Sequence, residues 1–163
     1  MAALTAGTKA PGFTLPTMDG KSISLQDALS RAPVVLAFFK VSCPTCQYAF
    51  PFLERIRQAY SELQILGISQ NDKKDTARFM KEFGVTFPVL LDDTKQYPVS
   101  NAYGLTNVPS IFWIGQDGQV ELASVGWDRR EIEHLNRKAA EVVHREATPL
   151  FHADEEIAAF RAG

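Results

Sequence analysis

The fold of this chain is decided by the stretch Val34-Val35-Leu36-Ala37-Phe38-Phe39-Lys40-Val41-Ser42-Cys43-Pro44-Thr45-Cys46. Its first six residues are all apolar, which is typical of a strand that is buried on both faces of a sheet. The two cysteines follow at once and open a segment in which Phe50, Leu53, Ile56 and Tyr60 recur at helical spacing. A buried strand that leads directly into an amphipathic helix indicates an α/β architecture.

The flanking sequence adds a hairpin and further strands and helices. Asp19-Gly20 lies between two short strand-like runs in residues 10–25, which predicts a β-hairpin. Ser24 with Asp27 predicts the cap of a short helix that ends near Leu29. The other predicted elements are helices over 43–60, 75–83 and 128–145, and strands over 63–69, 87–91, 110–114 and 119–125. This order predicts a mixed central β-sheet flanked by helices, an α/β sandwich of the thioredoxin kind with an added N-terminal hairpin.

Composition and charge describe a globular protein of 163 residues with 45% hydrophobic and 22% charged residues. We expect one thioredoxin-like domain over 1–147 and a polar tail over 148–163, with a helical turn or two near Ile157. Seventeen Lys and Arg against nineteen Asp and Glu give a net charge of −2, which argues against a nucleic-acid binder. No stretch is long enough to span a bilayer and no signal peptide is visible, so a cytoplasmic protein is expected, with export the alternative if a leader has been removed. A monomer is also expected.

Only two cysteines occur, and their Cys-x-x-Cys spacing suits a redox pair or half of a metal site. A structural zinc ion needs four ligands, and the only soft partners left are His134, His144 and His152. All three histidines lie in or after the last predicted helix, so we expect them at the surface and expect no metal. The sequence therefore favours redox chemistry, with no cofactor other than a Cys43–Cys46 disulfide.

The position of the motif predicts different roles for the two thiols. Cys43 comes at the start of a helix, where free backbone N–H groups and the helix dipole favour a thiolate. Pro44 suits the first helical position because the helix does not need its missing N–H. Cys46 returns to the same face one turn later and is expected to be more buried. These positions predict that Cys43 attacks and that Cys46 resolves the mixed disulfide.

The combined motifs resemble the thioredoxin-like (TlpA-like) branch of the alkyl hydroperoxide reductase/thiol-specific antioxidant superfamily, from about Gly7 to Arg145. The residues that carry the resemblance are Ala10-Pro11-Gly12-Phe13-Thr14-Leu15, Asp19-Gly20-Lys21, Phe38 to Cys46, Pro51 and Gly104-Leu105-Thr106-Asn107-Val108-Pro109-Ser110. It implies a thiol–disulfide oxidoreductase that acts on disulfide-containing proteins with an electron donor that the sequence does not identify. It also implies a cis Val108–Pro109 bond that faces the disulfide, and substrate contacts from Pro44, Thr45, Val108 and Pro109.

Two departures from the family pattern leave the proton acceptor of Cys46 open. Some relatives place a carboxylate three residues after the second cysteine, where this chain has Ala49. Thioredoxin keeps a buried Asp on the preceding strand, where this chain has Ala37. Lys40 either stabilises the thiolate or is a solvated lysine at the end of a strand, and the second interpretation is favoured. Trp127 is expected to pack at the start of the last helix.

The main alternative is a thiol-dependent peroxidase, because peroxiredoxins share the N-terminal segment. These enzymes need a Pro and a Thr at fixed spacing before the reactive cysteine. With Cys46 as that cysteine, the two positions hold Phe39 and Cys43, and with Cys43 the Thr position holds Lys40. Neither frame fits. A non-catalytic interaction module is a third possibility, and the presence of both cysteines and of Val108-Pro109 argues against it.

Overall fold

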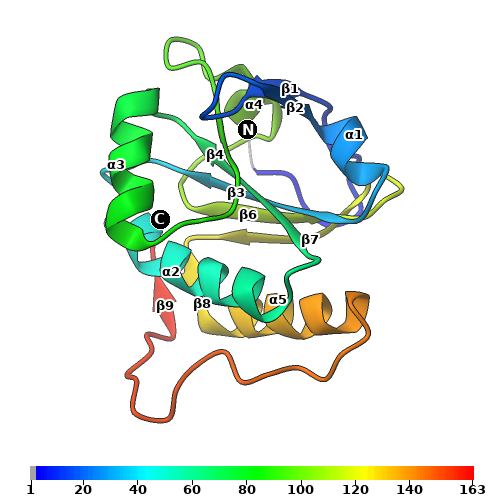
Figure 1. Cartoon of the computed structure of the whole chain (residues 1–163), viewed down its shortest axis with the longest axis vertical. Helices are drawn as coiled ribbons and strands as arrows, with labels where there is room; N and C mark the ends of the chain where they lie inside the picture. The colour runs from blue at the N-terminus through cyan, green and yellow to red at the C-terminus, as the bar shows by residue number, and fades with distance from the viewer. Residues whose placement is uncertain (1–2) are drawn as a thin grey trace.

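The computed structural model describes residues 3–163 and is built around a five-stranded mixed sheet (Figure 1). The strands, in their order across the sheet, are β5 (Val89–Leu91), β4 (Gln64–Ser69), β3 (Val34–Phe39), β6 (Ser110–Ile114) and β7 (Val120–Val125). β3, β4 and β5 run parallel, whereas β6 and β7 are antiparallel to their neighbours. All six residues of β3 are buried, so the predicted central strand and the predicted mixed sheet are confirmed.

Helices and the hairpin cover the two faces of the sheet. Successive residues of β3 point to opposite faces, so alternate side chains pack against different layers. Val35, Ala37 and Phe39 face one helical layer, and Val34, Leu36 and Phe38 face the other layer. The first layer is made of α2 (Pro44–Ala59), α3 (Lys73–Phe83) and α5 (Arg129–Val142). The second is made of α1 (Leu25–Leu29), α4 (Pro98–Ala102) and the predicted hairpin, β1 (Thr14–Pro16) with β2 (Ser22–Ser24). Figure 1 shows α2 and α5 below the sheet and the hairpin, α1 and α4 above it.

Short polar side chains start the helices where the sequence predicts. The Ser24 hydroxyl accepts a hydrogen bond from the Asp27 backbone N–H, and Asp128 accepts from Arg130 and Glu131 at the start of α5. α3 ends at Gly84, whose φ of 69° lies in the left-handed region that glycine tolerates. These local signals explain why three helix boundaries were predictable from single residues.

Three features depart from the prediction. The short helix α4 was not expected, and a two-stranded ribbon pairs β8 (Trp127–Asp128) with β9 (Phe160–Arg161). The predicted helical turn near Ile157 is wrong, because residues 155–158 form no regular secondary structure. Backbone groups of this part of the chain are engaged by other elements: the Trp127 indole N–H donates to the Ala158 carbonyl at 2.7 Å, and the Arg129 backbone N–H donates to the Ala159 carbonyl at 3.0 Å.

Residues 148–163 pack along α2 and α5 (Figure 1, orange to red). Leu150 is buried, and the Phe151 ring packs against Phe52 of α2 and Trp127. Glu155 forms an ion pair with Arg55 of α2 at 2.6 Å, and the hydrogen bonds from Arg55 lower the pKa of Glu155 to about 2. The predicted tail is therefore fixed to the domain by apolar, aromatic and ionic contacts.

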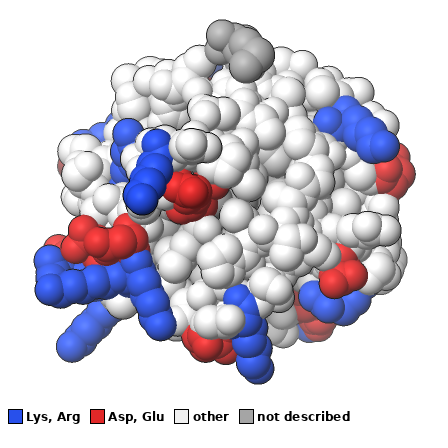
Figure 2. All heavy atoms as spheres, turned by 90° about the horizontal axis from the view of Figure 1, so that it is seen from above, with Lys and Arg blue, Asp and Glu red and all other residues white. Residues whose placement is uncertain are grey.

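The surface and the helices fit the predicted charge and hydropathy. Figure 2 shows a face that is largely uncharged, with Lys and Arg beside Asp and Glu toward its margins rather than in a basic stripe. Within residues 3–163, no helix combines the length and the hydropathy that crossing a bilayer requires.

Candidate active site

Cys43 is the N-cap residue of α2, as the sequence predicts. Its backbone is extended, with φ −80° and ψ 113°, and Pro44 follows as the first residue of the helix. The Cys43 Sγ accepts a hydrogen bond from the Cys46 backbone N–H at 3.0 Å. The sulfur thus occupies the place where a capping oxygen or a bound anion lies at other helix N-termini. A negative charge on this sulfur is stabilised by the helix that follows it.

Cys46 lies in the first turn of α2 and is fully buried, whereas Cys43 is partly exposed. Both thiols are free in the structure. Burial raises the pKa of the Cys46 thiol well above its ordinary value, and its contact with Cys43 raises it further. The backbone of Lys40 acts in the opposite direction with a smaller effect. One sulfur is therefore accessible at a helix N-terminus and the other is held neutral beneath it.

The Val108–Pro109 peptide bond is cis and lies beside Cys43, which confirms the prediction. The Cys43 thiol donates to the Val108 carbonyl at 3.4 Å. Pro109 is buried and leads into β6, and the Ser110 hydroxyl donates to the Asn107 carbonyl at 2.7 Å. The turn at residues 106–109 is thereby fixed across from Cys43.

The remaining predicted contact residues have different environments. Pro44 is exposed next to Cys43, but Thr45 is buried and its hydroxyl donates to the Ala162 carbonyl at 2.6 Å. The sequence gives no indication of this contact, because Ala162 contributes only a main-chain carbonyl. The structure therefore brings Cys43, Cys46, Val108 and Pro109 together and adds a partner for Thr45 from the far end of the chain.

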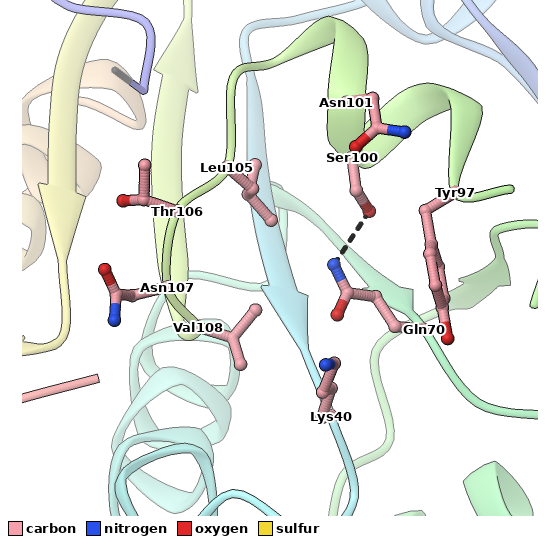
Figure 3. Close-up of a pocket in the computed structure, with 9 residues that line it drawn as sticks. All are labelled: Lys40, Gln70, Tyr97, Ser100, Asn101, Leu105, Thr106, Asn107 and Val108. Atoms are coloured by element: carbon pink, nitrogen blue, oxygen red, sulfur yellow. Dashed lines mark hydrogen bonds between the residues drawn. The ribbon is translucent and has the colours of Figure 1, made fainter. Parts of the chain in front are cut away.

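A polar recess of about 180 Å³ lies on the other side of the Val108 turn (Figure 3). Figure 3 shows Lys40, Gln70, Ser100 and Val108 around it. The Gln70 amide donates to the Ser100 hydroxyl at 3.0 Å, which fixes the buried Gln70 side chain. Lys40 is exposed, as expected of a solvated lysine at the end of a strand.

Two alanines occupy the positions where relatives have a carboxylate, and both are buried: Ala49 is 1% exposed and Ala37 is 0% exposed. The buried carboxylate on α2 is Glu54, eight residues beyond Cys46, or about 12 Å along a helix that rises 1.5 Å per residue. Its oxygens already accept hydrogen bonds from Thr86 and Phe87. Glu54 therefore anchors the helix and is too distant to take the proton of Cys46 directly.

The three histidines and Trp127 lie as predicted. His134, His144 and His152 are exposed, and Trp127 is fully buried against Tyr48 and other aromatic rings. Over residues 3–163, no three His, Cys, Asp or Glu side chains are grouped so that they would hold a metal ion.

Comparison with known proteins relates this site to described families. The model of the AhpC/TSA family matches residues 6–123. A thiol-disulfide oxidoreductase ResA of Halalkalibacterium halodurans is 31% identical over 124 residues, which cover 74% of this chain and 69% of the relative. A Mycobacterium tuberculosis protein that carries a peroxiredoxin name is 33% identical over 132 residues, with 74% of this chain and 84% of the relative covered. A Chlorobium tepidum structure named as a thiol:disulfide interchange protein DsbE has a TM-score of 0.75 at 26% identity, over 86% of this chain and 99% of that chain.

Proposed function

The chain belongs to the AhpC/TSA family and is a thiol–disulfide oxidoreductase, and we propose that Cys43 is its attacking thiol and Cys46 its resolving thiol. The observation that carries this assignment is the hydrogen bond from the Cys46 N–H to the Cys43 Sγ at the start of α2. It stabilises a thiolate on Cys43, and the thiolate is the form that attacks disulfides. The fully buried Cys46 is poorly placed to meet a substrate first.

The exchange runs in two balanced steps. In the first, the Cys43 thiolate attacks one sulfur of the substrate disulfide, the Cys43–substrate bond forms, and the other substrate sulfur leaves as a thiolate that takes up a proton. In the second, Cys46 loses its proton and attacks the Cys43 sulfur. The mixed disulfide breaks, the substrate leaves as a dithiol, and two electrons have passed from the enzyme to the substrate. A dithiol donor then returns the enzyme to its reduced form, and the reverse sequence oxidises a substrate.

The cis turn supplies the proposed docking site for the substrate backbone. The Val108 carbonyl is within 3.4 Å of the Cys43 sulfur, so a peptide that pairs with this turn carries its disulfide to the nucleophile. Backbone pairing gives affinity without demanding a particular side chain. We therefore expect a monomeric enzyme that acts on protein disulfides and is recycled by a separate thiol donor.

The test is to trap the mixed disulfide. In Cys46→Ser the second step is blocked, so incubation with an oxidised protein substrate is expected to accumulate a covalent adduct on Cys43. In Cys43→Ser the remaining thiol is buried and neutral, so no adduct is expected. Non-reducing electrophoresis of both variants gives the answer. The assignment is reversed if only Cys43→Ser traps substrate, and the redox proposal itself fails if neither variant forms an adduct and neither thiol alkylates.

Peroxide reduction is the second candidate function, and the relative with a peroxiredoxin name favours it. A peroxidase needs a hydroxyl next to its reactive sulfur to orient the peroxide. In residues 3–163 the hydrogen bonds of the Cys43 sulfur are to the Val108 carbonyl and the Cys46 N–H, and no hydroxyl takes part. Disulfide exchange needs no such group and is the function that the geometry favours.

A further inference from the structure

Residues 160–163, which we call the strap, lie across one side of the proposed exchange site. The Ala162 carbonyl accepts the Thr45 hydroxyl at 2.6 Å, and the Gly163 carbonyl accepts the Asn107 side-chain amide at 3.3 Å. The strap therefore touches both the cysteine motif and the turn that carries Val108. Figure 1 shows the red β9 running up to the start of α2.

The strap follows the main-chain surface that an extended peptide would use. A Cβ added to Gly126 would lie 2.7 Å from the Arg161 carbonyl, so the two backbones are in contact. A Cβ added to Gly163 would lie 2.6 Å from the Val108 carbonyl, which is the atom that accepts the Cys43 thiol. The strap thus fills the space bounded by Thr45, Gly126 and Val108.

The strap is less firmly held than the segment before it. Residues 150–159 are fixed by the buried Leu150, by the Arg55–Glu155 ion pair and by the hydrogen bond from Trp127 to Ala158. Within the strap, all four residues are exposed and Phe160 is 63% exposed. β9 pairs over only two residues. Short, exposed, singly paired strands are among the first elements to open locally, so the strap can lift while residues 150–159 stay in place.

We propose that the strap determines which disulfides reach Cys43. It occupies the peptide-binding side of the site, so an extended polypeptide must displace it before its backbone can pair with Val108. A small disulfide needs only the sulfur of Cys43, a residue that remains partly exposed with the strap in place. The polypeptide that fits has a backbone carbonyl for the Thr45 hydroxyl and a main chain that approaches Gly126 as closely as the Arg161 carbonyl does. This inference rests on the proposed exchange at Cys43.

The first test compares two substrates and three variants. One variant lacks residues 160–163. A second is Arg161→Pro, which removes a backbone N–H from the paired strand. Its matched control is Arg161→Ala, which keeps that N–H and removes the guanidinium that lies 4.6 Å from the centre of the Tyr48 ring. Each protein reduces insulin, a polypeptide disulfide, and oxidised glutathione, a small one, with dithiothreitol as the electron donor.

We expect the deletion and Arg161→Pro to lower the KM for insulin and Arg161→Ala to leave it nearly unchanged. If the strap is open in about one molecule in ten, its loss lowers that KM about tenfold. The kcat/KM for oxidised glutathione is expected to stay within about twofold. Equal changes for both substrates, or no change for insulin in variants with a native circular-dichroism spectrum, overturn the role of the strap. If the wild-type protein reduces neither substrate, the proposed function fails instead.

The second test detects displacement itself and does not depend on turnover. Trypsin cleaves after Arg161, whose backbone is paired with Trp127 in the free protein. In Cys46→Ser carrying a covalently trapped insulin chain, cleavage after Arg161 is expected to be several times faster than in the free variant. The matched control is the same variant disulfide-bonded to glutathione, in which the rate stays at the free value. Equal cleavage rates in all three forms would contradict displacement by a polypeptide.

Discussion

Cys43 and Cys46 are separated by two residues, yet one turn of helix gives their sulfurs opposite environments. The Cys43 sulfur caps α2 and is partly exposed, whereas the Cys46 sulfur is in the core and its pKa is raised by burial. The order of reaction follows from this difference. Cys43 can react with a reagent from solution in the folded protein, whereas Cys46 can react only if the fold opens.

At this scale we predict that alkylation distinguishes the two thiols. In native protein at pH 7, iodoacetamide is expected to modify Cys43 and to leave Cys46 unmodified. Because the folded pKa of Cys46 is raised, its reaction is expected to stay slow as the pH passes the ordinary cysteine value of about 8.5. Mass spectrometry of peptides after a pH series measures this. Reaction of Cys46 at the rate of an unfolded control peptide at pH 8.5 would contradict the assigned burial.

The residues of the site differ in how far they were predictable. Cys43 and Cys46 were found from the sequence because they follow a buried apolar strand and open a helix, whereas Pro109 was found through the family resemblance. The partner of Thr45 was not predictable, because the Ala162 carbonyl is 117 positions away and every residue has a carbonyl. Main-chain contacts between distant segments leave no pattern in side chains, so the strap was missed.

The helix α2 carries its own anchor as well as both cysteines. Glu54 is 5% exposed and accepts hydrogen bonds from the Thr86 backbone N–H at 2.8 Å and the Thr86 hydroxyl at 2.7 Å. Arg57 and Gln58 also donate to it. Burial acts to raise the pKa of Glu54, but these hydrogen bonds outweigh it and lower the pKa. Glu54 thereby ties the helix to the loop that leads into β5.

We predict that Glu54→Ala lowers the free energy of unfolding by about 3 kcal/mol, because it leaves a buried N–H and a guanidinium without their partner. Glu54→Gln keeps one acceptor oxygen and is expected to cost less. The control is Glu62→Ala, which removes a carboxylate that is 56% exposed in its ion pair with Arg145 and is worth about 1 kcal/mol or less. Urea denaturation measures all three.

The pH dependence of this effect has a definite sign. The pKa of Glu54 is lower in the folded protein than in the unfolded chain. The ionised carboxylate therefore stabilises the fold fully above the ordinary glutamate pKa of about 4.3, and this stabilisation is lost as the pH falls through the folded pKa. The difference between wild type and Glu54→Gln is therefore expected to shrink in acid. A difference that grows below pH 4 would contradict the lowered pKa.

The elements of the fold were predictable in proportion to their length and burial. The six-residue strands β3 and β4 and the long helices α2 and α5 contain enough apolar residues for their spacing to identify the type of element. β9 has two residues, both exposed, and its pairing depends on Trp127 and Asp128 rather than on its own sequence. In a segment of two residues, the spacing of apolar side chains cannot show the two-residue repeat of a strand or the 3.6-residue repeat of a helix.

The molecule as a whole directs one partly exposed sulfur to the surface between a fixed turn and a strap. The predicted mixed sheet flanked by helices and the predicted hairpin are confirmed, and the departures concentrate at α4 and in residues 148–163. Those residues cross from α5 to α2 and then to the exchange site (Figure 1). Residues 160–163 thus complete one side of a site whose cysteines and cis turn lie within residues 43–109.

At this scale we predict that hydrogen peroxide is a poor substrate. No hydroxyl contact to the Cys43 sulfur is seen in residues 3–163, and a well-placed proton-transferring group contributes about 10²–10⁴-fold to a rate. Peroxide consumption with dithiothreitol as donor is therefore expected to be about 100-fold slower, or more, than insulin reduction. Cys43→Ser is the control for the background reaction. Fast, saturable peroxide turnover that Cys43→Ser abolishes would establish the peroxidase instead.

The separation between Thr45 and Ala162 also sets an order of events during synthesis. β3 pairs with β4 about 30 positions later and with β6 about 80 positions later, so the segments that hold the cysteines and Val108 are synthesised before residues 160–163. At about 5–20 residues per second, the roughly 48 residues from Ile114 to Ala162 take about 2–10 s to make. A nascent chain whose sheet formed within those seconds would expose Cys43 without the strap. Such a chain would lack the selectivity that we propose for the complete site.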